Sequence, residues 1–62
     1  MKELEKKYCF LKILTSENRV LFYSRVLVVE VTNTHISFID KYNRTCIFPI
    51  TAILEAKEEN GY

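Results

Sequence analysis

Hydrophobic and polar positions alternate along most of the chain, which is the pattern of strands that bury one face. Short clusters of Ser, Thr and Asn interrupt the alternation, and these side chains hydrogen-bond their own backbone in turns. Five runs, separated by such clusters or by the single proline, are predicted to be strands: residues 8–15, 19–31, 35–40, 44–48 and 53–57. The predicted fold class is therefore all-β, in one domain that spans residues 1–62.

The two ends of the chain leave alternatives open. Residues 2–7 are strong helix formers and predict a short N-terminal helix. After Pro49, one interpretation is a single 3₁₀ turn followed by the fifth strand, which closes a small barrel. The other is a helix capped by Thr51 and stopped by Asn60 and Gly61, which leaves a four-stranded meander with a C-terminal helix. We favour the strand, because four short strands need a fifth element to cover an open edge.

The longest predicted strand, residues 19–31, is apolar on both faces. One face is predicted to turn toward the core. The full predicted core is Phe10, Val20, Phe22, Val26, Val28, Ile36, Phe38, Ile47 and Ile53. The opposite face is predicted to lie outside and to bind a partner or a second copy of the chain, because exposed apolar patches mark interaction sites. Its residues are Leu21, Tyr23, Leu27, Val29 and Val31.

A basic and aromatic hairpin tip follows the third predicted strand. Asn43 is suited to the left-handed backbone conformation that a short hairpin loop requires. The neighbouring side chains of Lys41, Tyr42 and Arg44 are therefore predicted to project from the loop and to contact a partner. Tyr and Arg are frequent anchors of protein interfaces, and a Tyr ring can also stack on a nucleic-acid base.

Composition narrows the function classes. The chain is 48% hydrophobic, and this share excludes a disordered chain. It has nine Lys and Arg and eight Asp and Glu, and this balance excludes a general phosphate-backbone binder, which would carry an excess of positive charge. No apolar run approaches the ~20 residues of a membrane span, so we expect no membrane association. The N-terminal segment lacks a secretory signal pattern, and the chain has only two cysteines. A cytoplasmic location is predicted, with Cys9 and Cys46 as reduced thiols in the core.

Catalytic and metal-binding residues are sparse. His35 and Cys46 are the obvious catalytic pair, but the predicted hairpin separates them by roughly 10 Å at ~3.3 Å per residue, beyond hydrogen-bond reach. A zinc site needs about four ligands, and Cys9, His35 and Cys46 are isolated from one another. We therefore expect no enzymatic activity, no cofactor and no metal. The acidic clusters near the ends are interpreted as solvated charges: Glu3 and Glu5, and Glu55, Glu58 and Glu59.

The order of the predicted elements resembles the small five-stranded barrel shared by Src-homology-3-like (SH3-like) and Sm-like proteins. Residues 46–53, Cys-Ile-Phe-Pro-Ile-Thr-Ala-Ile, are similar to the closing strand, turn and strand of bacterial Sm-like RNA chaperones. The chain differs in having no glycine between residues 21 and 31, and only Asn33 where those proteins carry an aspartate and an asparagine. The resemblance implies the barrel fold, and no binding residue is carried over from it.

Two functions follow as expectations. The first is a non-catalytic module that acts through protein–protein interaction. Small proteins of this composition are common among phage and mobile-element products, including inhibitors of host enzymes. The alternative, implied by the resemblance, is a single-stranded RNA-binding protein that assembles as a homo-oligomeric ring.

Overall fold

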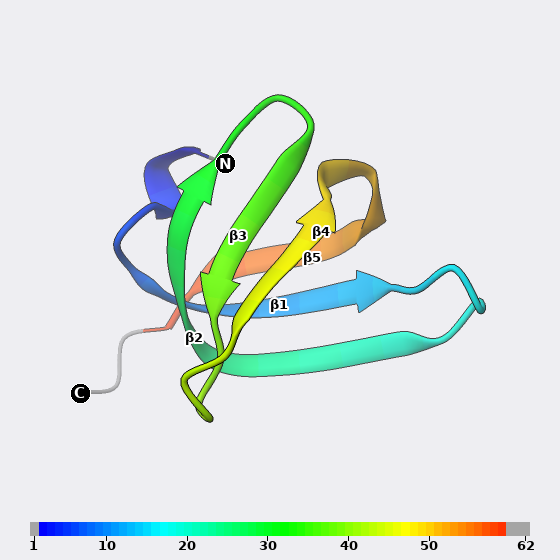
Figure 1. The fold of residues 1–62 in the computed structure, drawn as a ribbon, viewed down its shortest axis with the longest axis horizontal. Coiled ribbons are helices and arrows are strands. Elements are labelled where there is room, and N and C mark those ends of the chain that lie inside the picture. The colour runs from blue at the N-terminus through cyan, green and yellow to red at the C-terminus, as the bar shows by residue number, and fades with distance from the viewer. Residues whose placement is uncertain (1, 60–62) are drawn as a thin grey trace.

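The computed structural model describes residues 2–59 and shows one antiparallel sheet of five strands (Figure 1). The elements in chain order are η1 (Lys2–Leu4), β1 (Tyr8–Leu14), β2 (Val20–Val31), β3 (His35–Ile39), β4 (Thr45–Pro49), η2 (Ile50–Ala52) and β5 (Ile53–Glu58). The predicted all-β fold and its five strands are confirmed. The alternative C-terminal helix is wrong over Ile53–Glu58, which is a strand, and its predicted stop at Asn60 and Gly61 lies outside the described residues.

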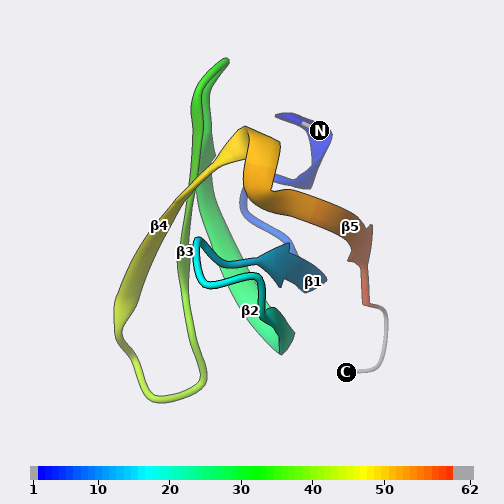
Figure 2. The same cartoon turned by 90° about the vertical axis from the view of Figure 1, so that its right-hand side faces the viewer.

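The sheet order is β4-β3-β2-β1-β5, so β4 and β5 are its two edge strands. Figure 2 shows these two strands on opposite sides of the molecule, with the other strands between them. Closure of the sheet into a barrel therefore stays a prediction. Within residues 2–59 there is no helix of the length and apolar character that crossing a membrane requires.

The predicted N-terminal helix is reduced to a single 3₁₀ turn. Lys6 takes a left-handed conformation with φ of 65°, which ends the helical path. The next backbone groups pair with β2 instead, because Lys6 N donates to Val28 O at 2.7 Å and Val28 N donates to Lys7 O at 3.1 Å. Leu4 is buried, so the turn covers one end of the core.

Strand β2 is bent at two places where its pairing shifts register. Figure 1 shows it running along β1 and then turning sharply toward β3. The first register shift lies between Cys9 and Leu11 of β1, and opposite it Arg25 of β2 has a left-handed backbone conformation with φ of 58°. A second shift lies between Val28 and Glu30 of β2, opposite β3. Each bulge adds one residue to β2, and an added residue moves the following side chains to the other face.

The bulges overturn part of the predicted core. Val26, Val28, Ile36 and Phe38 are buried as predicted, and Phe10 and Ile53 are partly buried. Three predicted core residues are instead on the outside: Val20 at 40% exposure, Phe22 at 66% and Ile47 at 61%. The buried hydrophobic residues of the described chain are Leu4, Cys9, Leu11, Ile13, Val26, Val28, Val31, Ile36 and Phe38.

The predicted outward face of β2 is corrected for the same reason. Leu27 and Val29 lie outside, as predicted. Leu21 and Tyr23 precede the first bulge, and they share the inner face with their partners Ile13 and Leu11 on β1. Val31 follows the second bulge and is only 5% exposed. The predicted face is thus divided between the two sides of the sheet.

Ile47 is exposed because of the register of β4. Phe38 pairs with Cys46, and this register turns Cys46 and Phe48 inward. The Phe48 ring stacks on Phe38 with centroids 5.9 Å apart, and Tyr23 meets Phe38 edge-on at 5.1 Å. Ile47, between the two inward residues, must therefore face outward.

The first bulge of β2 and the end of that strand are each held by a carboxylate from a distant segment. Glu59 Oε1 accepts a hydrogen bond from Arg25 N at 2.6 Å and another from Ser24 Oγ at 3.2 Å. Glu5 Oε2 accepts one from Val31 N at 2.7 Å. The interpretation of Glu5 and Glu59 as merely solvated charges is wrong. Their carboxylates accept hydrogen bonds from the backbone N–H groups of Val31 and Arg25.

Candidate binding surface

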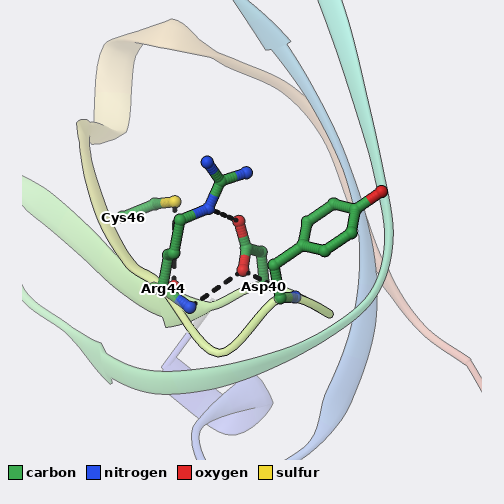
Figure 3. A network of polar contacts seen from close by, with 4 residues as sticks. Asp40, Arg44 and Cys46 are labelled. Carbon is green, nitrogen blue, oxygen red and sulfur yellow. Dashed lines mark hydrogen bonds and ion pairs between the residues drawn. The ribbon is translucent and has the colours of Figure 1, made fainter.

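The hairpin tip is organised around one buried carboxylate. Asp40 is 8% exposed and accepts hydrogen bonds from the backbone N–H groups of Tyr42 and Arg44, both at 2.9 Å (Figure 3). Arg44 Nε also donates to Asp40 Oδ2 at 3.2 Å. Asn43 adopts φ of 64°, as predicted for the loop. The tip is therefore fixed by side-chain bonds as well as by the strand ladder.

These contacts hold Asp40 in its ionised form. The hydrogen bond from the Arg44 backbone N–H is the main cause that lowers the pKa of the Asp40 carboxyl below its ordinary value of 3.8. Burial opposes this effect, while the Tyr42 N–H and the Arg44 charge add to it. Asp40 is not among the site residues predicted from the sequence. Its signal is the position at the start of a turn, where an Asp side chain accepts from the following N–H groups.

The predicted site residues of the tip all lie on the surface. Tyr42 is 66% exposed, with the Arg44 guanidinium carbon 5.2 Å and Lys41 Nζ 5.3 Å from its ring centre. Figure 3 shows the two terminal nitrogens of Arg44 directed away from the Asp40 carboxylate. The tip thus presents an aromatic ring with two cations beside it.

A concavity of about 230 Å³ separates the tip from the bend of β2. Phe22, Tyr23 and Ser24 line it on the β2 side, and Asp40, Tyr42 and Arg44 line it on the tip side. This concavity therefore places Tyr23, a residue of the predicted β2 face, next to the predicted tip. Partial burial is the main cause that raises the pKa of the Tyr23 hydroxyl, so this hydroxyl stays protonated and neutral.

A second surface, which we call the apolar face, covers part of the outside of β1, β2, β3 and β4. Its residues are Tyr8, Leu27, Val29, Ile39 and Ile47. Tyr8, Leu27 and Ile39 form one row across three strands, because Leu27 pairs with both other residues. Tyr8, Val29 and Ile47 are 46%, 47% and 61% exposed. A shallow concavity of about 310 Å³, lined by that row and by Lys41, connects the apolar face to the tip.

The candidate catalytic pair is not assembled. His35 pairs with Pro49, three positions along the hairpin from the pair of Phe38 and Cys46, and its Nδ1 lies 2.8 Å from Thr34 Oγ1. Cys9 and Cys46 are free thiols, and burial is the main cause that raises the pKa of each. A raised pKa reduces the thiolate fraction and hence nucleophilicity. Residues 2–59 contain no group of three or more His, Cys, Asp or Glu arranged to hold a metal ion.

Comparison with protein-family models, with curated proteins and with solved structures finds no match to this chain. Its function is therefore argued from the surfaces described above.

Proposed function

We propose that this protein is a non-catalytic binding module that docks a partner protein on its apolar face, with the hairpin tip as an anchor. One observation carries the proposal: a row of apolar side chains crosses three strands on the outside of the sheet and reaches the hairpin tip at Lys41 and Asn43. The exposed Tyr42 and Arg44 belong to the same tip. A contiguous exposed apolar patch of this kind is typical of protein interaction sites. Tyr and Arg beside it are the residue types that contribute most to binding.

The rigidity of the tip supports an anchoring role. Arg44 is held at Nε by Asp40, and the backbone on either side of Asn43 is held by the same carboxylate. Side chains that are already ordered lose less entropy when a partner binds. We therefore expect Tyr42 and Arg44 to contribute more to affinity than flexible surface residues would.

We further propose that the module acts in the cytoplasm as an accessory or inhibitor protein of a phage or mobile element. Its small size and composition favour such a role, and its two free thiols fit a reducing compartment.

Affinity capture with matched variants tests the proposed function. The immobilised protein should retain one partner protein at a constant ratio after nuclease treatment. Ile47→Ser and Tyr42→Ala should each lose that protein while keeping the circular dichroism spectrum of the wild type. Leu54→Ser is the control, because Leu54 is 50% exposed on β5, outside the apolar face. Retention of the partner by both site variants would contradict the proposal.

A further inference from the structure

Three aromatic rings on the outside of the protein each have a cation nearby. Lys12 Nζ lies 5.9 Å from the centre of the Phe22 ring, and Lys57 Nζ lies 5.5 Å from that of Phe10. Tyr42 has Arg44 and Lys41 at 5.2 and 5.3 Å. We call these three rings and their four cations the aromatic–cation track.

The rings lie along a continuous path. Phe10 and Phe22 are neighbours on β1 and β2, with centroids 6.2 Å apart and planes tilted by 32°. Lys12 pairs with Phe22, and Lys57 of β5 pairs with Phe10, so all four side chains share the outer face of these three strands. Phe22 also lines the concavity that Tyr42 lines, and this concavity connects the sheet surface to the tip.

Positive charge is concentrated on this path. The track holds four of the nine Lys and Arg side chains of a protein whose net charge is only +1. Two acids lie near it. Asp40 is buried in the tip, where it accepts hydrogen bonds from the loop, and Glu55 lies 3.8 Å from Lys57 on the surface. The track therefore remains positive overall.

The alternation of ring and cation matches the alternation of base and phosphate in a single strand. An exposed ring offers a face on which any base can stack, and nearby Lys or Arg side chains can contact the phosphates. Phe22 is 66% exposed, so its ring is available to a ligand. Lys12 is half-buried, and its cross-strand partner on β5 is Glu55, with which no ion pair within 4.0 Å is seen among residues 2–59. A duplex keeps its bases stacked inside, and an acidic peptide offers charge without bases.

We infer that the aromatic–cation track binds single-stranded nucleic acid, one base on each ring, within a single copy of the chain. This inference uses different side chains from the proposed protein docking, because Phe10, Lys12, Phe22 and Lys57 are not residues of the apolar face. The two surfaces adjoin on the outer side of β1, where Tyr8 precedes Phe10. Only the tip is common to the two surfaces. Since the contacts read neither the 2′-hydroxyl nor base edges, the track should bind DNA and RNA strands similarly.

Fluorescence anisotropy with a labelled oligothymidylate, a labelled oligouridylate and a labelled duplex tests the inference. Both single strands should bind, and the duplex should bind clearly more weakly. Phe22→Leu and Phe10→Leu keep an apolar side chain but remove the stacking ring, so each should weaken single-strand binding about fivefold or more. Replacing Lys12 and Lys57 together by Gln should reduce the slope of log affinity against log salt by about 1.4, which corresponds to two lost phosphate contacts.

Two matched variants serve as controls. Lys2→Gln removes one positive charge from η1, and Leu54→Ala shortens an exposed side chain of β5 that belongs to neither surface, so neither should change the affinity by more than about twofold. Absence of single-strand binding by the folded wild type would overturn the inference. Equal binding of the duplex, or unchanged binding by both Phe variants, would also overturn it, because the attraction would then be charge alone. Captured protein partners that survive Phe22→Leu would show that the protein-docking proposal stands separately.

Discussion

At the scale of single residues, three carboxylates stabilise the backbone by accepting hydrogen bonds from its N–H groups. Asp40 and Glu59 accept hydrogen bonds from backbone N–H groups at a turn and at a bulge, and Glu5 accepts one from the last residue of β2. Unpaired backbone donors are costly, so a carboxylate that reaches them stabilises an irregular conformation. Two of these contacts join residues 26 and 34 positions apart, which is why local sequence patterns did not indicate them.

We predict that Glu59→Ala lowers the free energy of unfolding by about 1 kcal/mol, because it removes the acceptor of the Arg25 N–H and the Ser24 hydroxyl. Urea unfolding measures the change. Glu58→Ala is the control: among the described residues, the Glu58 side chain forms an exposed ion pair with Lys7 at 3.4 Å, so its loss should cost less than about 0.5 kcal/mol. Equal effects of the two substitutions would show that the hydrogen bonds of Glu59 at the bulge do not stabilise the fold.

Asp40 predicts a dependence of stability on pH. Its pKa is lowered in the folded protein, so its contribution to stability is fully present above the ordinary value of 3.8 and is lost as the pH falls through the lowered value. Urea midpoints should therefore fall on acidification in that range. The Asp40→Asn variant should show a smaller fall than the wild type. Identical acid dependence of the two proteins would mean that Asp40 is not held as a carboxylate by the tip.

At the scale of elements, the sequence predicts where strands begin and end better than which way they face. Turn residues bound the strands, and Asn18 and Asn43 take the left-handed conformations expected of them, with φ of 63° and 64°. Facing was predicted by counting every second residue, and the two bulges of β2 break that count. Their signal is the polar residues inside an apolar run, Arg25 at the first bulge and Glu30 at the second.

We predict that substitutions of Arg25 change the stability of the protein according to how well the new residue adopts a left-handed backbone conformation. Arg25→Val should lower the free energy of unfolding by about 1–2 kcal/mol, because a β-branched residue strongly disfavours positive φ. Arg25→Gly should be tolerated far better, since glycine adopts this conformation without steric cost. Thermal or urea unfolding of the two variants measures the difference. If valine were tolerated as well as glycine, the bulge would not require a left-handed residue at this position.

At the scale of the whole molecule, the candidate surfaces were only partly predictable. The tip residues Lys41, Tyr42 and Arg44 could be found because they are adjacent in sequence and flank a turn residue. The apolar face and the aromatic–cation track each combine residues from at least three strands. Their composition depends on the facing of β2, and Phe22, which was predicted to be in the core, is the most exposed ring of the sheet surface.

The exposed apolar face also predicts self-association of the isolated protein. Light scattering should show an apparent mass that rises with concentration, because pairing of two such faces removes Ile47 and Val29 from water. Ile47→Ser should shift this association to higher concentration. A strict monomer at every concentration would leave a different protein as the occupant of the face.

The hydrogen bond between the Glu59 carboxylate and the Arg25 N–H has a consequence for the synthesis of the protein. A ribosome makes β2 and the hairpin tip well before it makes residue 59. Until that carboxylate has left the exit tunnel, the bend that forms one wall of the tip concavity lacks its restraint, and β1 lacks its partner strand β5. Contacts between segments distant in sequence form late in folding. A nascent chain whose residue 59 is still inside the exit tunnel should therefore display its binding surfaces incompletely.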